Sequence, residues 1–268
     1  MTVESGPARA GALVIVGAGI QLGRHVAERA LSEIRAADRV FAMLDPFALD
    51  WLRSLRPDCE NLARFYAAGR DRRETYRDME RVLVEAVRAG ERTCAVFYGH
   101  PGVFADVPHG AIRAVRALGL PARMEPGISA EACLYADLGL DPGERGVISM
   151  EATQFLVHER RPDPTMLLVL WQVALAGDLA LKEFSADPDR LRVLVAKLAE
   201  TYAPDTETIL YEAAQLPVQR FRADRMPLAA LPEAEYREFT TLVIPACAGP
   251  EPDDEWLERL GADRSALE

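Results

Sequence analysis

The apolar run at residues 12–18, Ala-Leu-Val-Ile-Val-Gly-Ala, narrows most what this chain can fold into. It is rich in β-branched residues and is closed by Gly17 and Gly19. Such a run is typical of a parallel strand that is buried on both faces. Apolar residues at helical spacing follow it and predict a helix over residues 22–34. The start of the chain therefore indicates an α/β fold.

The same unit of strand and helix repeats up to about residue 126. Alternation of this kind implies right-handed crossovers and a mainly parallel sheet. The predicted strands are 39–44, 93–97 and 122–124, and the predicted helices are 46–55, 76–88 and 107–118.

The second half of the chain has strands that are closer together and less regularly separated by helices. This spacing of strands and helices predicts a second lobe with a mixed sheet. We expect an N-terminal lobe at 11–126, a C-terminal lobe at 127–247 and an acidic tail at 248–268. The predicted strands of the second lobe are 147–150, 166–170, 208–211, 219–222 and 241–245, and its predicted helices are 130–138 and 188–201.

Composition limits the class of protein. With 268 residues, of which 49% are hydrophobic, the chain can bury a large core. The formal charge is -11, from 31 Lys and Arg against 42 Asp and Glu, and no basic block is interleaved with aromatic residues. Nucleic acid and anionic membranes are therefore poor candidate partners.

Cysteine spacing and the N-terminus indicate the compartment. Cys59, Cys94, Cys133 and Cys247 are too far apart in sequence to form the close pairs of zinc sites or small disulfide scaffolds. We expect reduced thiols and no metal site. No basic region precedes the first apolar run, and that run is too short to span a bilayer. These features predict a soluble cytoplasmic protein.

Gly17, Gly19 and Gly23 form the pattern G-x-G-x-x-x-G, which is one residue longer than the dinucleotide-binding fingerprint. Asp45, at the end of the second predicted strand, is the best candidate for the acidic residue of that fingerprint. A lone glycine signature is weak, so both NAD binding and a structural tight turn stay open on this motif.

Two further loops follow predicted strands. One is Tyr-Gly-His-Pro-Gly-Val-Phe at residues 98–104, and the other is Pro-Gly-Ile-Ser-Ala at residues 126–130. Open α/β sheets bind ligands at the carboxyl ends of their strands. With the first glycine loop and the strand end at 168–172, these motifs resemble the tetrapyrrole methylase family over residues 11–246.

This resemblance implies a two-lobed fold with S-adenosylmethionine in the cleft between the lobes. Most members of that family have Asp in the loop G-D-P-x-x-F, where this chain has His100. The loop around His100 and the segment 126–138 resemble one branch, the borosin α-N-methyltransferases, which methylate backbone amides of a peptide. By this likeness we expect the cofactor to lie against Gly17, Tyr98, His100, Val103, Phe104, Ser129, Ala130, Gln172, Ala213 and Val243.

The same branch places its reactive residues upstream, where this chain has Tyr66 and the pair Arg72-x-x-x-Tyr76. If a helix begins near Arg72, the spacing of four puts that pair on one face. Arg70 and Arg73 are alternatives in the same turn. Without the likeness, a solvated basic helix start explains these residues equally well.

Peptide chemistry explains why such residues are needed. A peptide nitrogen donates its lone pair into the carbonyl and is a poor nucleophile. Arg72 can stabilise negative charge on the carbonyl oxygen, and Tyr66, Tyr76 or Tyr98 can donate hydrogen bonds or take the amide proton. The sequence does not show which of the three phenols is the donor and which takes the amide proton. His100 is either a hydrogen-bonded loop residue, the reading we favour, or a proton carrier.

Only about twenty residues follow Pro245, and they do not resemble a Val/Ile-rich core peptide. This predicts a separate precursor peptide that binds in trans, S-adenosylhomocysteine as the by-product, and a homodimer that forms a heterotetramer with two peptides. The alternatives are a C-methyltransferase for a tetrapyrrole such as a cobalamin precursor, and a non-catalytic scaffold that binds a peptide.

Overall fold

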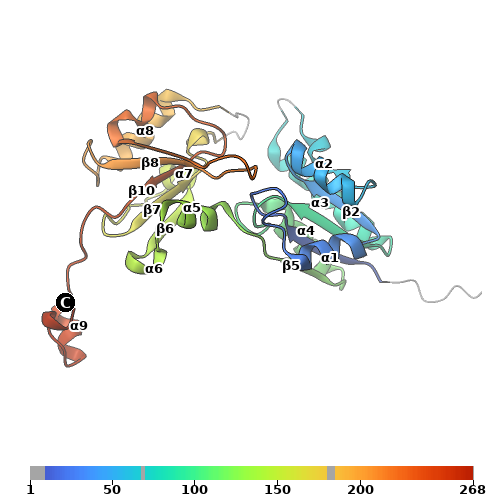
Figure 1. The fold of residues 1–268 in the computed structure, drawn as a ribbon, viewed down its shortest axis with the longest axis horizontal. Helices are drawn as coiled ribbons and strands as arrows, with labels where there is room; N and C mark the ends of the chain where they lie inside the picture. Colours follow the sequence, from blue (N-terminus) through green and yellow to red (C-terminus); the bar gives the residue numbers. More distant parts are fainter. Residues whose placement is uncertain (1–9, 68–69, 180–184, 268) are drawn as a thin grey trace, which may run out of the picture. The chain divides into compact units, whose positions relative to one another are not determined.

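The computed structural model describes residues 10–67, 70–179 and 185–267, and their contacts group them into two compact units (Figure 1). Unit 1 contains the described residues up to Leu140, with those of the segments Asp178–Phe184 and Tyr211–Ala223. Unit 2 contains the rest, which are Asp141–Gly177, Ser185–Leu210 and the described residues from Asp224 onward.

The division along the chain differs from the expected one near residue 126. Residues 127–140 group with unit 1, and so does the later segment Tyr211–Ala223. One physical reason is a hydrogen bond of 2.7 Å from the Tyr211 hydroxyl to Oδ2 of Asp137, which ties the two segments together. Contacts between residues far apart in sequence leave no trace in a composition pattern.

Unit 1 contains a five-stranded sheet in the order β3-β2-β4-β1-β5. Every strand pair in it is parallel, as the alternation of strands and helices predicts. All carboxyl ends therefore meet at one edge of the sheet. The strands are β1 (Ala12–Gly17), β2 (Arg39–Met43), β3 (Glu60–Asn61), β4 (Arg92–Phe97) and β5 (Ala122–Glu125).

Helices cover both faces of this sheet. Alternate residues of β1, β2 and β4 point into two separate cores, one under α1 and α2 and the other under α3 and α4. The strands are almost wholly buried, which explains their continuous apolar runs. The helices are α1 (Glu28–Ala36), α2 (Pro46–Leu55), α3 (Arg72–Arg88), α4 (Asp106–Ala117) and α5 (Ala130–Leu138), and a 3-10 turn, η1 (Leu62–Phe65), precedes α3.

The helix predicted over residues 22–34 begins late, at Glu28. The residues before it form a turn in which Gly19 and Gly23 have positive φ angles of 70° and 72°. Nδ1 of His25 accepts backbone N–H bonds from Ile20 and Gln21, so these amides are satisfied without a helix. The apolar spacing predicts the helix correctly but not this side-chain competitor.

The second sheet has the order β6-β7-β10-β8-β9. β6 and β7 are parallel, whereas β7 and β10 are antiparallel, so the predicted mixed sheet is confirmed. The strands are β6 (Val147–Glu151), β7 (Leu167–Trp171), β8 (Glu207–Glu212), β9 (Arg222–Pro227) and β10 (Thr241–Ile244).

The strand predicted at 219–222 was wrong, because β9 begins at Arg222. The segment before it is a turn in which Oε1 of Gln219 accepts from the backbone N–H groups of Gln215 and Leu216. A side chain that satisfies backbone donors in this way favours a turn over a strand.

Helices α7 and α8 pack with the 3-10 segment η3 against the buried side of the second sheet. Lys197 on α8 donates to the carbonyl oxygens of Phe155 (2.7 Å), Leu156 (3.0 Å) and His158 (2.5 Å), and so satisfies the carboxyl end of α7. The remaining elements are α6 (Pro142–Arg145), α7 (Ala152–Val157), η2 (Val173–Leu175), α8 (Pro188–Leu198), η3 (Leu228–Glu233), α9 (Asp254–Arg259) and η4 (Arg264–Leu267).

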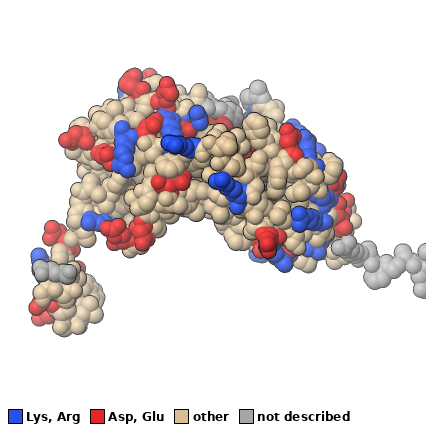
Figure 2. Space-filling view, viewed as in Figure 1, with Lys and Arg blue, Asp and Glu red and all other residues tan. Residues whose placement is uncertain are grey.

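The acidic tail forms the short helix α9, which has no buried residue. Its Trp256 is 58% exposed, and the guanidinium of Arg259 lies 4.5 Å from the centre of the indole ring. Acidic and basic side chains are interspersed over the face shown in Figure 2. Among the helices that the structure describes, none is both long enough and apolar enough to span a bilayer.

Candidate active site

Three glycine loops meet at the carboxyl edge of the sheet in unit 1. A Cβ atom placed on Gly17 would lie 2.5 Å from the carbonyl oxygen of Gly99 and 2.7 Å from Cα of Gly127. A Cβ on Gly127 would lie 2.3 Å from the same oxygen. Distances this short exclude any side chain, so the backbones after β1, β4 and β5 touch directly. Glycine is needed at Gly17 and Gly127 for this close approach, whereas Gly99 contributes its carbonyl oxygen and has a positive φ angle of 66°.

Backbone hydrogen bonds hold the loops in register. Gly19 and Gly99 form an isolated antiparallel bridge, with N–H to O distances of 3.2 and 2.8 Å. The N–H of Tyr98 donates to the carbonyl oxygen of Met43 at the end of β2. The loop after β4 is therefore tied to both neighbouring strands of the sheet.

His100 is hydrogen-bonded within its own loop. Nδ1 of His100 accepts from the N–H of Gly102 at 2.9 Å, and the His100 carbonyl accepts from Val103 at 3.1 Å. Nδ1 of His occupies the same place on its side chain as Oδ1 of Asp, which forms this type of turn with the backbone two residues on. The loop role of His100, favoured over proton transfer, thus has a structural basis.

The loop after β4 also presents exposed aromatic and apolar side chains. Tyr98 is 60% exposed and Phe104 is 53% exposed, and Val103 and Ile128 are exposed as well. Phe104 has a φ angle of +50°, which is unfavourable for a residue with a side chain. Strain of this kind persists where the surroundings enforce it, and it is common at ligand sites.

Tyr66 and the first turn of α3 form a cluster of phenols around a guanidinium. α3 begins at Arg72, so Arg72 and Tyr76 lie one turn apart on one face, as their spacing predicts. The side chain of Tyr66 is hydrogen-bonded to that of Tyr76, and it senses the charges of Arg72 and Tyr98. The structure therefore brings together all four residues that were predicted to be catalytic.

The pKa of the Tyr66 phenol is raised above its ordinary value of 10.0. Burial is the largest cause, the charge of Tyr76 and the hydrogen bond to it add to it, and the charge of Arg72 acts in the opposite direction. A phenol with a raised pKa stays protonated at neutral pH. Tyr66 is thus available as a hydrogen-bond donor.

The alternative arginines in this turn have other roles. Arg70 forms an ion pair of 2.5 Å with Asp78 and donates to the carbonyl oxygen of Phe65 at 3.4 Å. Arg73 is 68% exposed and lies 4.0 Å from the carboxylate of Asp71. Arg72 is the arginine of the three whose charge acts on Tyr66.

Ser129, Ala130 and Ala213 also lie in unit 1. Oγ of Ser129 accepts from the N–H of Ala132 at 3.1 Å and caps α5, whose first residue is Ala130. Ser129 lies two residues after Gly127, so α5 begins directly after the glycine loop. Ala213 follows the end of β8 and is half-buried.

Gln172 and Val243 belong to unit 2. Gln172 follows β7 in the left-handed conformation, with φ 54° and ψ 41°. In the part of the chain that the structure describes, Gln172 and Phe104 are the two non-glycine residues with positive φ, and both were predicted to bind cofactor. Val243 lies in β10 opposite Val169 and is fully buried. Cofactor contacts of these residues stay predictions.

Asp45, the candidate for a dinucleotide-binding acid, is instead the N-cap of α2. Its Oδ1 accepts from the backbone N–H groups of Phe47 (2.9 Å) and Ala48 (3.1 Å). This is the ordinary capping role of Asp before a helix that starts with Pro46. Asp45 therefore does not support the interpretation of the first glycine motif as an NAD site.

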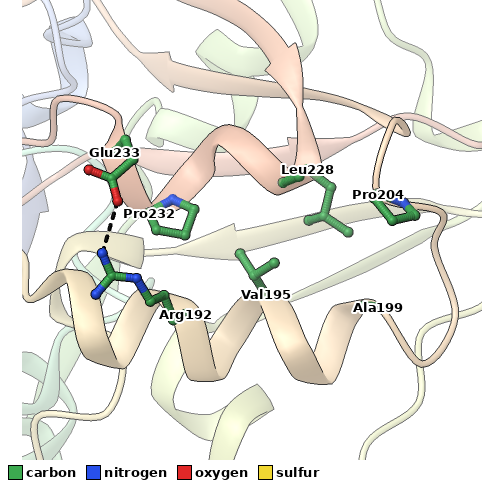
Figure 3. A pocket seen from close by; sticks show the side chains of 8 residues that line it. Arg192, Val195, Ala199, Pro204, Leu228, Pro232 and Glu233 are labelled. Atoms are coloured by element: carbon green, nitrogen blue, oxygen red, sulfur yellow. Dashed lines mark hydrogen bonds and ion pairs between the residues drawn. The ribbon is translucent and has the colours of Figure 1, made fainter.

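A cavity of about 430 Å³ lies between α8 and η3 of unit 2 (Figure 3). Its walls are mainly apolar, with Val195, Leu228 and Pro232 among them, and the ion pair of 2.9 Å between Arg192 and Glu233 stands at one end. None of the predicted site residues lines it. Within residues 10–67, 70–179 and 185–267, no three His, Cys, Asp or Glu side chains are grouped so that they could hold a metal ion.

Sequence reasoning missed three residues that support the first glycine loop, which are His25, Asp137 and Tyr211. His25 binds the loop backbone, and the negative charge of Asp137 acts on its imidazole. Tyr211 donates to Asp137. These residues are 186 positions apart from first to last, and no motif or spacing signals such a contact.

Comparison with known proteins agrees with this arrangement of loops. Residues 12–231 match the family described as Tetrapyrrole (Corrin/Porphyrin) Methylases. Among solved structures, the uroporphyrin-III-C-methyltransferase from Thermus thermophilus has a TM-score of 0.64 and 21% identity, covering 88% of this chain and 93% of that one. The cobalt precorrin-4 methyltransferase has a TM-score of 0.62 and 16% identity, covering 87% and 94%. These structures confirm the fold.

More similar sequences have names that combine two parts. One is the methyltransferase/ribosomally synthesized cyclic peptide gymnopeptides precursor of Gymnopus fusipes, 35% identical over 94% of this chain and 61% of the relative. Another is the methyltransferase/omphalotin A precursor of Omphalotus olearius, 37% identical over 85% and 55%. A type II borosin cyclic peptide precursor of Phlebiopsis gigantea is 32% identical over 91% and 45%.

The chain thus spans about half the length of the relatives that it matches. The family match, by contrast, extends over most of the chain and includes all three glycine loops. The protein belongs to the tetrapyrrole methylase family.

Proposed function

We propose that the protein uses S-adenosylmethionine to methylate backbone amide nitrogens of a ribosomally made peptide. One observation carries this proposal, the cluster of Tyr66, Tyr76, Tyr98 and Arg72, in which a protonated phenol and a guanidinium lie together. The names of the relatives, which join a methyltransferase to a cyclic peptide precursor, support it.

The residues of unit 1 fit S-adenosylmethionine. The loops of Gly17, Gly99 and Gly127 pack together at the carboxyl edge of the parallel sheet, which is where open α/β sheets bind ligands. The exposed rings of Tyr98 and Phe104 offer apolar surface beside them. We propose that these loops, with His100, Val103, Ser129, Ala130 and Ala213, hold the cofactor. When bound, S-adenosylmethionine supplies an electrophilic methyl group on a sulfonium.

The residues of the cluster would make the peptide nitrogen reactive. Removal or weakening of the N–H bond places negative charge on the peptide carbonyl oxygen. Arg72 presents a fixed positive charge with several N–H donors, and Tyr66 keeps its proton because its pKa is raised. A donor aimed at such an oxygen lowers barriers by roughly 3–4 kcal/mol in other enzymes.

The raised pKa of Tyr66 bears on which phenol takes the amide proton. Tyr66 holds its proton more strongly than a free phenol does, because of burial and of its bond to Tyr76. We therefore assign Tyr66 as a donor and leave Tyr76 and Tyr98 as the phenols that can accept the amide proton. The second candidate chemistry, C-methylation of a tetrapyrrole, needs no such activation of an amide.

The source of the peptide is a separate question. We predicted a separate precursor in trans and a homodimer that forms a heterotetramer with two peptides. The names of the relatives place the precursor in the same chain as the methyltransferase, so they do not support a separate peptide. The separate precursor and the homodimer stay predictions.

The test combines the purified chain with S-adenosylmethionine, with and without a synthetic peptide that has a Val/Ile-rich carboxyl end. A mass gain of about 14 Da per methyl, placed on backbone nitrogens by fragmentation, supports the proposal. Methylation of the chain itself without added peptide contradicts the trans arrangement. Methylation of a tetrapyrrole precursor but of no peptide contradicts the proposed function, and so does the absence of turnover, which would favour a scaffold.

A further inference from the structure

The segment between β1 and α1 is shaped by one histidine. Nδ1 of His25 accepts from the backbone N–H of Gln21 at 3.1 Å and from that of Ile20 at 3.3 Å. The N–H of Leu22 donates to the carbonyl oxygen of Gln215, from a distant part of unit 1. These bonds satisfy the amides of three successive residues, so the position of the loop depends directly on the His25 ring.

The same residue is packed against Gly19. A Cβ atom on Gly19 would lie 2.1 Å from Cβ of His25, so the histidine fills the place where another residue would have its side chain. Gly19 is the residue that bridges to Gly99 in the loop after β4. The His25 side chain therefore reaches the proposed cofactor loops through a single glycine.

Accepting two N–H bonds fixes the chemical form of the ring. Nδ1 must carry a lone pair, so a neutral ring has its proton on Nε2. The negative charge of Asp137 acts on this imidazole, and Asp137 in turn accepts from the buried hydroxyl of Tyr211 at 2.7 Å. Tyr211 thus binds the Asp137 carboxylate, and the charge of that carboxylate acts on His25.

We propose that His25, supported by Asp137 and Tyr211, is a positioning residue that sets the affinity for the cofactor by holding the loop of Gly17 and Gly19 against Gly99. This inference rests on the proposed function, since it takes the three glycine loops to be the cofactor site. It places no chemistry on His25, which touches the loop and not the reacting atoms.

The protonation state of His25 gives the proposal a pH dependence. Burial lowers the pKa of His25 below 6.5, the charge of Asp137 raises it, and the charge of Arg24 lowers it. A proton on Nδ1 would replace the acceptor with a donor that faces two other donors. The loop should therefore lose its support as the pH falls below 6.5, while the ring is neutral and the support is complete above that value.

The experiment measures the dissociation constant of S-adenosylhomocysteine by calorimetry at about pH 7.5 for the full chain and three variants. His25→Ala removes the acceptor and should weaken binding about tenfold or more. His25→Asn keeps an acceptor at the position of Nδ1 and should bind within about threefold of the unchanged chain. His158→Ala, at the end of α7 in unit 2, is the control and should bind normally.

Two further measurements separate positioning from general damage. Turnover of peptide at saturating cofactor should change little in His25→Ala, while KM for the cofactor rises with the dissociation constant. Affinity of the unchanged chain should fall between about pH 7.5 and about pH 5.5, and that of His25→Asn should not. If His25→Ala does not fold, as circular dichroism will tell, Tyr211→Phe takes its place with an expected loss of about threefold or more.

The outcomes distinguish failure of the proposed function from failure of the positioning role of His25. If the unchanged chain does not bind S-adenosylhomocysteine at all, the proposed function fails. If it binds, but His25→Ala or its substitute binds equally well, the cofactor site stands and the positioning role of His25 is overturned. Equal losses in His25→Ala and His25→Asn would also overturn it, because then the acceptor is not what matters.

Discussion

The side chains of Tyr66 and Tyr76 share a hydrogen bond, although ten residues separate them in the chain. Tyr66 follows the 3-10 turn η1, and Tyr76 lies one turn after the start of α3. Their bond favours the protonated form of Tyr66, while the charge of Arg72 favours the ionised form. A phenol whose protonated form is favoured in this way is suited to the role of hydrogen-bond donor.

Replacement of Arg72 should separate binding from chemistry. Arg72→Lys keeps the charge but loses the planar fork, so we expect kcat for peptide methylation to fall about 100-fold while cofactor affinity changes little. Arg73→Lys, one residue on and largely exposed, should stay within about twofold. Steady-state kinetics and calorimetry measure both. Equal losses in the two variants would contradict the role of Arg72.

Tyr76→Phe removes the hydroxyl that is bonded to Tyr66 and keeps the ring. We expect turnover to fall well over tenfold, since either the base or the partner of the donor is lost. Single-turnover methylation measured by mass spectrometry shows the effect on chemistry. Normal turnover with normal cofactor binding would exclude Tyr76 from the reaction.

The glycine contact should not tolerate a methyl group. In Gly17→Ala the new Cβ would lie 2.5 Å from the carbonyl oxygen of Gly99, so the loops must move apart. We expect the free energy of unfolding to fall by about 1–3 kcal/mol. Gly249→Ala is the matched control, because no heavy atom lies within 4 Å of its added Cβ. Urea unfolding compares them, and similar stability of both variants would argue against the close contact.

Restoration of the turn at His100 tests its structural role. His100→Ala removes the acceptor for the Gly102 N–H, and we expect cofactor affinity to fall about fivefold or more. His100→Asn and His100→Asp keep an acceptor at the same distance along the side chain and should restore binding. If neither variant restores it, the imidazole has a function beyond the turn.

Glu33 should make stability depend on acid pH. It is 2% exposed and lies within 2.8 Å of Arg29, Arg92 and Arg123. Burial raises the pKa of Glu33, but the hydrogen bond from Arg92 and the charges of the arginines outweigh it and hold the pKa below 4.5. The folded state thus binds fewer protons than the unfolded state just below pH 4.5, and stability is lost as the pH falls through that window.

Substitution of Glu33 isolates this effect. Glu33→Gln leaves three arginines around a neutral side chain and should cost about 3–5 kcal/mol near neutral pH. The loss should shrink as the pH falls through the lowered pKa of Glu33, because the unchanged carboxylate is then protonated as well. The control Glu85→Gln breaks an exposed pair with Arg81 and should cost about 0.5 kcal/mol or less. Urea unfolding at several pH values gives both series, and a constant difference would contradict the role of Glu33.

Local patterns were sufficient where the spacing of apolar residues or adjacent residues in the chain decide the element. The run before Gly17 predicts β1 because a strand buried on both faces needs apolar side chains on both. The helix predicted over residues 46–55 is α2, and its start depends on residues that are adjacent in sequence, the cap Asp45 and Pro46 in the first turn. The pair Arg72 and Tyr76 was placed correctly for the same reason, since helical spacing alone puts them on one face.

Sequence patterns gave wrong bounds for a helix or a strand where a side chain accepts from backbone N–H groups in place of a backbone carbonyl. His25 lies in the predicted helix but binds the amides of Ile20 and Gln21 before it, and Gln219 lies in a predicted strand but binds the amide of Gln215. Such competition is decided by a few hydrogen bonds of about 1 kcal/mol each, which propensities do not resolve.

By itself, the sequence determined that this protein has an α/β fold with a parallel first sheet, glycine loops at its strand ends, and Arg72 one helical turn from Tyr76. These depend on periodicity and on residues that are neighbours in the chain. Only the tertiary structure decided that the loops of Gly17, Gly99 and Gly127 touch and that Tyr66 lies with Arg72 and Tyr76. It also decided that Tyr211 binds Asp137, whose charge acts on His25. Such contacts join residues distant in sequence, and they form only when the packing of the sheet and its helices brings the loops to one edge.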